Sequence, residues 1–177
     1  MERHELIVDS VVVRFGEETV LSGGYITSST GCVTGLLGRN GTGKSCMFRA
    51  LMGGLPVENV MVSIDGQPVD RKTIGLLVKY LPQGRLIPGG VPLKRAFQLY
   101  GVNFWDFVNR FPVYARYHDS AIWELIRERS RDHGIIVTDH NFDAITTVAG
   151  NLFIISDGYT HPVQGREDLV RYGYLRD

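Results

Sequence analysis

Residues 38–45 read Gly-Arg-Asn-Gly-Thr-Gly-Lys-Ser, a segment that fulfils the pattern G-x-x-x-x-G-K-[ST] at every fixed position. Glycines allow the backbone to curl, so that consecutive N–H groups can point inward at phosphate oxygens. The apolar run Val33–Leu37 precedes the segment, and a helical pattern from Lys44 to Met52 follows it. A helix that begins here presents its positive N-terminal end to the same anion. The segment therefore predicts a phosphate-binding loop between a buried strand and a helix.

Two side chains of this segment carry the chemistry expected of such a loop. Lys44 is placed to reach the β- and γ-phosphates of a nucleotide, and the Ser45 hydroxyl is placed to ligate Mg²⁺. Cys46 follows on the first turn of the helix. The residues expected to bind the nucleotide here are Gly38, Arg39, Asn40, Gly41, Thr42, Gly43, Lys44, Ser45 and Cys46.

The composition predicts one soluble globular domain, residues 1–177. Hydrophobic residues make up 44% of the chain and charged residues 21%. Nineteen basic side chains balance nineteen acidic ones, so the net charge does not favour nucleic acid as a partner. No window approaches the roughly 18 uninterrupted apolar residues of a membrane span. Cys32 and Cys46 match neither a disulfide nor a metal-ligand pattern, which indicates a reducing compartment and hence the cytoplasm.

Strand patterns and helix patterns alternate along the chain. Runs of β-branched and apolar residues predict strands at 6–8, 11–13, 19–26, 33–37, 60–64, 74–81, 135–138, 152–156 and 159–163. A mostly helical stretch is expected from Pro92 to Asp132, with Ser120 as a helix cap, and shorter helices at 141–148 and around Leu169. This order predicts an α/β fold with a mostly parallel sheet and antiparallel strands at its N-terminal side.

Four segments, taken in order, resemble the ATP-binding subunits of ABC transporters. Residues 35–45 resemble the Walker A segment of that family, which usually carries asparagine before the central glycine. Phe15, ahead of the second strand, resembles the aromatic residue that stacks on adenine. Residues 80–83, Tyr-Leu-Pro-Gln, are similar to the Q-loop, and residues 136–140, Ile-Val-Thr-Asp-His, are similar to the switch-histidine segment. The resemblance covers most of the chain.

The resemblance implies a P-loop NTPase-like domain that binds ATP and Mg²⁺. It implies that Gln83 approaches the metal and the attacking water, so that Ser45 and Gln83 are the expected metal-binding residues. It also implies that His140 contacts the γ-phosphate, which makes Gln83 and His140 the expected catalytic pair. The implied partners are a transmembrane permease subunit or a second ATPase subunit. The implied location is cytoplasmic, at the inner face of the membrane.

The interval between Gln83 and His140 departs from the family, because the two residues lie only 57 positions apart. The family places there a helical subdomain, the LSGGQ signature, the Walker B strand with its Asp-Glu pair, and the D-loop, which together need roughly 90 residues. Neither the signature nor an apolar strand ending in Asp-Glu occurs in this interval. A reduced helical subdomain is expected at about residues 92–120. The string Leu-Ser-Gly-Gly at 21–24 precedes Walker A in a strand position, and we interpret it as a coincidence.

The shortened interval predicts a domain that binds Mg-ATP but hydrolyses it poorly or not at all. Walker B holds the metal and its glutamate activates water, so their loss removes groups that are often worth about 10²–10³ in rate each. Loss of the Walker B strand is also expected to remove a strand beside the one that leads into the loop. Two alternatives remain: a non-enzymatic interaction module that pairs with a full-length ATPase or permease subunit, or a degenerate gene product. A P-loop nucleotide kinase is disfavoured, because residues 80–83 and 138–140 have no place in one.

Overall fold

The computed structural model describes residues 2–80, 119–138 and 142–175. Its contacts divide the chain into two units, residues 1–79 together with 126–177, and residues 80–125. The eight strands found in these described ranges all belong to the first unit. The reduced helical subdomain expected at about 92–120 lies outside the described residues, apart from its last two positions. Within the described ranges, no helix combines the length and apolar character that a bilayer crossing requires.

An antiparallel group of strands forms one side of the sheet. Its members are β1 (Glu5–Phe15), β2 (Glu18–Ser29), β4 (Asn59–Ile64) and β5 (Gln67–Pro68). The long β1 pairs with both β2 and β4, and β4 pairs with β5. The two short runs expected at 6–8 and 11–13 are parts of this single strand, which is bulged near Ser10, a residue with φ of 54°.

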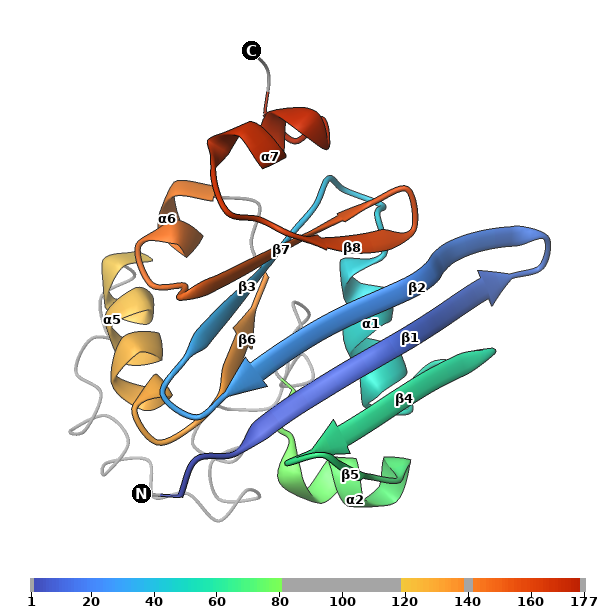
Figure 1. Cartoon of the computed structure of the whole chain (residues 1–177), viewed down its shortest axis with the longest axis horizontal. Helices are drawn as coiled ribbons and strands as arrows, with labels where there is room; N and C mark the ends of the chain where they lie inside the picture. The colour runs from blue at the N-terminus through green and yellow to red at the C-terminus, as the bar shows by residue number, and fades with distance from the viewer. Residues whose placement is uncertain (1, 81–118, 139–141, 176–177) are drawn as a thin grey trace, which may run out of the picture. The chain divides into compact units, whose positions relative to one another are not determined.

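A second group of strands carries the segment that leads into the glycine-rich residues. Its members are β3 (Val33–Leu37), β6 (Ile135–Val137), β7 (Asn151–Ser156) and β8 (Tyr159–Pro162). β3 runs parallel to both β6 and β7, while β8 pairs antiparallel with β7 and parallel with β2. The order across the sheet is β5-β4-β1-β2-β8-β7-β3-β6. This mixed sheet, with its antiparallel N-terminal part, confirms the predicted α/β class (Figure 1).

Helix α1 (Lys44–Leu51) supplies much of the core by packing on β1, β2 and β4. Its buried face consists of Met47, Phe48, Ala50 and Leu51. Gly24 on β2 lies against this helix, since a Cβ at that position would stand 2.5 Å from the Met47 Cε. Figure 1 shows α1 behind the long hairpin of β1 and β2. Burial of these apolar side chains fixes the start of α1 directly after the glycine-rich residues.

Three further helices are described in the C-terminal part of the chain. They are α5 (Asp119–Ser130), α6 (Phe142–Thr146) and α7 (Arg166–Arg171). α6 packs against β3, where a Cβ on Gly35 would stand 2.5 Å from the Ile145 Cγ2. The prediction that Ser120 caps a helix is wrong, because α5 already includes Asp119. Ser120 therefore lies inside the helix, past the position at which a cap satisfies free N–H groups.

The prediction of a strand at 74–81 is wrong, because residues Arg71–Leu77 form helix α2. Asp70 is its N-cap, and the Asp70 Oδ1 accepts hydrogen bonds from the backbone N–H groups of Lys72 at 2.8 Å and Thr73 at 2.9 Å. Ile74 is fully buried while Leu76 and Leu77 are exposed, which is a pattern for one helical face rather than a buried strand. The apolar run in the sequence was ambiguous, and the Asp70 cap together with burial of Ile74 favours a helix.

The pH dependence of this cap is a testable consequence. Backbone hydrogen bonds from Thr73 and Lys72 hold the pKa of Asp70 below its ordinary value of 3.8. The carboxylate therefore stabilises the fold fully above 3.8, and this contribution is lost as the pH falls through the lower folded-state pKa. We expect this loss in the free energy of unfolding of the wild type, measured by urea denaturation from about pH 5 to pH 2. Asp70→Asn keeps an acceptor without a titrating group, so it should lack this component. An identical pH profile in both proteins would contradict the assignment.

The expectation that β3 has lost a neighbouring strand is also wrong. β3 pairs with β7 along one edge and with β6 along the other. Among the strands that the structure describes, β6 is the last one on that side of the sheet. Any strand missing from this chain therefore belongs beyond β6, because both edges of β3 already have hydrogen-bonded partners.

Candidate functional site

The glycine-rich loop, residues 38–45, leaves the carboxyl end of β3, whose five residues are all buried. Three of its glycines have positive φ angles: 151° at Gly38, 87° at Gly41 and 99° at Gly43. Side chains other than glycine rarely adopt this region, so the sequence pattern and the backbone path agree. A Cβ at Gly38 would also stand 2.6 Å from the Thr42 Oγ1 and 3.2 Å from the Ile155 carbonyl oxygen.

Gly43 is the N-cap of α1 and makes no side-chain capping hydrogen bond. The first backbone N–H groups of a helix have no partner within the helix, so an end without a side-chain cap is available to an anion. No acidic residue stands in the first turn of α1 to compete for this position. Gly43 lies close to β2. A Cβ added to Gly43 would stand 3.0 Å from both Val20 Cγ1 and Leu21 Cδ2.

The Lys44 side chain folds back onto the glycine-rich loop. Its Nζ donates hydrogen bonds to the Gly38 carbonyl at 2.5 Å and to the Arg39 carbonyl at 2.9 Å. The Arg39 carbonyl also accepts from the Thr42 N–H at 3.3 Å and from the Thr42 hydroxyl at 2.9 Å. Burial lowers the pKa of Lys44, because a partly desolvated ammonium loses hydration. Two backbone carbonyl groups of the loop thus hold the ammonium group in place. A phosphate can replace these carbonyl groups as the hydrogen-bond partner of Lys44.

The remaining expected nucleotide contacts lie on or near this loop. Asn40 and Ser45 are exposed and Cys46 is half-buried. Phe15 ends β1, next to the turn into β2, and 48% of its surface is exposed. The same hairpin supplies Val20 and Leu21, which line the Gly43 position. The tertiary structure therefore brings the β1–β2 hairpin beside the glycine-rich loop. The Phe15 ring lies exposed at the tip of this hairpin, where a ligand can contact it.

The other two expected site residues lie outside the described residues. Gln83 falls in the interval 81–118 and His140 in the interval 139–141. The strand that leads to His140 is described, since β6 runs parallel to β3 with Gly35 opposite Val137. The carboxyl ends of parallel neighbours share one edge of a sheet, so β6 ends on the same edge from which the loop starts.

Thr138 is a candidate residue that the sequence analysis did not single out within the 136–140 segment. It follows β6 directly, and its Oγ1 is buried without a hydrogen-bond partner among the residues that the structure describes. A buried hydroxyl without a partner is unfavourable, so it marks a place where a ligand or water can form the missing bond. Only the sheet pairing places this hydroxyl at the same edge as the loop.

The unpartnered hydroxyl predicts an unusual response to mutation. Thr138→Val removes the unsatisfied group at nearly constant volume, and we expect the free energy of unfolding to rise by about 1 kcal/mol. Thr34→Val on the neighbouring strand is the matched control, because the Thr34 hydroxyl donates to the Thr27 carbonyl at 2.8 Å. That variant should lose about 1 kcal/mol. Urea unfolding of both variants is the measurement, and equal losses would contradict an unpartnered Thr138.

The string Leu-Ser-Gly-Gly at 21–24 lies in the middle of β2. Leu21 is fully buried, and the Ser22 N–H donates to the Gly158 carbonyl at 2.8 Å. These residues pair with β1 along the strand, with Leu21 opposite Val13. The segment therefore opens no helix, and the strand position expected for it is confirmed.

Comparison with protein families gives a match to the model described as ABC transporter over residues 22–150. The manganese transport system ATP-binding protein MntA of Synechocystis sp. is 31% identical over 94 residues, which is 52% of this chain and 36% of MntA. The cobalt import ATP-binding protein CbiO of Salmonella typhi is 42% identical over 64 residues, which is 36% of this chain and 24% of CbiO. The chain thus spans about a third or less of the length of these curated relatives.

Solved structures with a similar fold include an ATP binding subunit of an ABC transporter, with a TM-score of 0.70 and 17% identity. That match covers 97% of this chain and 94% of the other. A nucleotide-free ATP-binding cassette from an ABC transporter gives a TM-score of 0.69 at 15% identity, over 98% of this chain and 96% of the other. These two likenesses establish the fold.

Proposed function

This chain belongs to the ABC transporter family, and on that basis we propose that it is an ATP-binding subunit that binds Mg-ATP and hydrolyses it poorly or not at all. The main observation behind the proposal is that two groups able to bind an anion lie at the same glycine-rich loop. The N-terminus of α1 has no side-chain cap, and the Lys44 ammonium lies at the Gly38 and Arg39 carbonyl groups of the same loop. Polyphosphate is the ligand that uses a helix N-terminus and an adjacent ammonium together.

In this proposal the loop residues 38–46 hold the phosphates and Phe15 stacks on the adenine. The backbone N–H groups of the first turn of α1 bind phosphate oxygens, and Lys44 exchanges its two carbonyl partners for the β- and γ-phosphates. The exposed Phe15 ring and the short distance from the β1–β2 hairpin to Gly43 support the adenine contact. The buried Thr138 hydroxyl offers one more hydrogen bond at the same edge.

Mg²⁺ fits the donor chemistry of the loop. The Ser45 hydroxyl stands on the exposed first turn of α1, where an oxygen ligand for a metal bound to phosphates is required. When bound, Mg²⁺ neutralises charge on the phosphate oxygens. In the described ranges no group of three or more His, Cys, Asp and Glu side chains forms a metal site of its own. Ser45, together with Gln83 from the segment that resembles the family's Q-loop, is the metal-binding pair that we propose.

The proposal of weak hydrolysis rests on the short interval between Gln83 and His140 and on the motifs that this interval does not contain. Gln83 and His140 lie 57 positions apart, and the interval between them contains neither an LSGGQ signature nor an apolar run that ends in Asp-Glu. Gln83 and His140 remain as the proposed catalytic pair, without the carboxylate that activates water. β6 is the last strand on its side among those that the structure describes, which agrees with a shortened sheet.

We further infer that the chain works with a transmembrane permease subunit or a second ATPase subunit, at the cytoplasmic face of a membrane. Membership of the family supports this inference, as do the names of relatives that are ATP-binding proteins of transport systems. The test is affinity purification of the tagged chain from solubilised membranes. Recovery of a permease or a full-length ATPase subunit is expected, and recovery of the chain alone would count against the inference.

The proposed function is tested by titrating the wild-type protein with Mg-ATP, Mg-ADP and AMP while phosphate release is followed in the ATP samples. We expect saturable binding of ATP and ADP, much weaker binding of AMP because it lacks the β- and γ-phosphates, and little phosphate release. Rapid phosphate release would overturn the proposal of weak hydrolysis. Absence of saturable ATP binding would overturn the proposal of an ATP-binding subunit and favour the non-enzymatic interaction module.

A further inference from the structure

A cavity of about 380 Å³ lies beside the glycine-rich loop, on the side of β7 and α7. Its lining comes from three segments of the same unit: the loop, the end of β7 and the residues that complete and follow α7. The residues that matter for its chemistry are Arg39, Thr42, Ser156, Asp157, Arg171 and Tyr172. The volume falls in the range of about 300–1,000 Å³ that small-molecule sites occupy.

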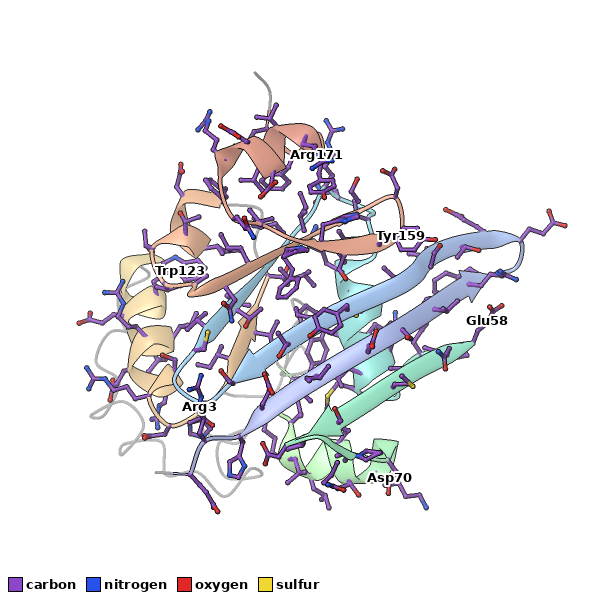
Figure 2. All side chains as sticks on the ribbon, in the orientation of Figure 1. Arg3, Glu58, Asp70, Trp123, Tyr159 and Arg171 are labelled. Carbon is purple, nitrogen blue, oxygen red and sulfur yellow. The ribbon has the colours of Figure 1, made fainter. Side chains whose placement is uncertain are left out.

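This cavity lies beside the anion site of the proposed function and shares part of the glycine-rich loop with it. Lys44, Ser45 and the N-cap Gly43 do not line it, whereas Arg39 and Thr42 do. The buried residues Ile154 and Ile155 form part of its wall. Figure 2 shows Arg171 at the end of α7 next to the segment that leaves β3.

The charge of the lining is positive. Arg39 and Arg171 contribute two guanidinium groups, and Asp157 is the one carboxylate among the lining residues. Within the described part of the chain, neither arginine has a carboxylate within salt-bridge distance. The Asp157 Oδ2 instead accepts a hydrogen bond from the Ser156 hydroxyl at 3.0 Å. Two arginines without a carboxylate partner in one cavity are suited to an oxyanion, because each guanidinium can donate two parallel hydrogen bonds.

One wall of the cavity is held in place by an aromatic contact. The Tyr172 ring stacks on His161 of β8 with a centroid distance of 4.3 Å and an interplanar angle of 13°. The Arg171 guanidinium carbon lies 6.0 Å from the centroid of the same ring. This contact connects the end of α7 to β8, and Arg171 itself is exposed.

We propose that this cavity is a second anion site, which binds the phosphate group of a small phosphorylated molecule between Arg39 and Arg171. The site shares Arg39 and Thr42 with the loop of the proposed ATP site, whereas Arg171 belongs to this cavity and not to that loop. Arg39 also belongs to the glycine-rich loop, where its carbonyl accepts a hydrogen bond from the Lys44 Nζ at 2.9 Å.

The test is arginine labelling with phenylglyoxal, read residue by residue by mass spectrometry, in the presence and absence of inorganic phosphate. The full chain carrying Lys44→Ala is compared with the wild type, so that binding in the glycine-rich loop is weakened. We expect phosphate to slow the labelling of Arg39 and Arg171 several-fold in both proteins. The labelling of Arg166, which is exposed on α7 and does not line the cavity, should not change.

Two substitutions on α7 make the test specific. Arg171→Gln should abolish the phosphate protection of Arg39, whereas Arg166→Gln should leave it intact. Protection of Arg39 that disappears with Lys44→Ala would place the anion in the glycine-rich loop alone and overturn the proposal. Equal labelling with and without phosphate in the wild type would overturn it as well, without reliance on any variant. ATP titration of Arg171→Gln separates the two sites, because unchanged ATP affinity is expected.

Discussion

Lys44→Ala is expected to weaken Mg-ATP binding by about 10- to 100-fold while leaving the chain folded. The estimate follows from about 1.5–3 kcal/mol for a hydrogen bond to a charged group, the interaction that the ammonium would make with the phosphates. In the structure this ammonium is already partly desolvated, and its partners are two carbonyl groups of the loop. It therefore gains more from a phosphate than a fully hydrated lysine does. Isothermal titration with Mg-ATP is the measurement.

Lys72→Ala is the matched control for this prediction. Lys72 is an exposed lysine on α2, and its backbone N–H, not its ammonium, takes part in the Asp70 cap. The same loss of one positive charge at this position should leave ATP affinity unchanged within error. Equal affinities of the Lys44→Ala variant and the wild type would contradict the assignment of Lys44 to the phosphates. Equal losses in both variants would instead indicate a general electrostatic attraction.

Gly38→Ala is expected to destabilise the protein by roughly 3 kcal/mol and to abolish saturable ATP binding. The backbone φ of 151° belongs to a region that costs other residues about 1–3 kcal/mol. The new Cβ would also lie 2.6 Å from the Thr42 Oγ1 and 3.2 Å from the Ile155 carbonyl oxygen, and overpacking of this kind typically costs about 1–3 kcal/mol. The Ile155 carbonyl belongs to β7, which is paired on both sides and cannot readily shift. Urea unfolding and ATP titration measure the two effects.

Gly41→Ala separates backbone strain from steric overlap within the same loop. Gly41 has a φ of 87°, but a Cβ there would have no atom within 4 Å. This variant should lose only the contribution of strain, about 1–2 kcal/mol. A destabilisation as large as that of Gly38→Ala would mean that contact with β7 is not what limits residue 38. Undiminished ATP binding by Gly38→Ala would contradict a role for the loop conformation.

Much of the fold could be predicted because its signals are local. Residues 38–45 specify a loop between strand and helix, since positive φ angles at Gly38, Gly41 and Gly43 are a property of single residues. Helix α1 follows from apolar residues spaced by three and four, which are the ones it buries. Strands β6, β7 and β8 likewise match short β-branched runs bounded by turns. The family resemblance rested on these same local segments, and the match over residues 22–150 confirms it.

The errors arose where a local pattern allows two structures. The apolar run from Ile74 to Leu77 suits either a strand or a helix, and burial of Ile74 alone, with Asp70 as cap, favours the helix. The same limit applies to sheet order. The residues of β3 do not reveal that β6 and β7 are its neighbours, because these strand pairs join segments about 100 positions apart in the sequence.

The sequence by itself determined the glycine-rich loop, the strand and helix that flank it, and the family to which they belong. The tertiary structure alone decided which groups surround that loop. It placed the β1–β2 hairpin at Gly43, the unpartnered Thr138 hydroxyl at the shared sheet edge, and Arg171 in one cavity with Arg39. The physical reason is that backbone conformation and capping depend on residues a few positions apart. Contacts between strands and helices depend instead on how buried apolar surfaces pack across the whole unit.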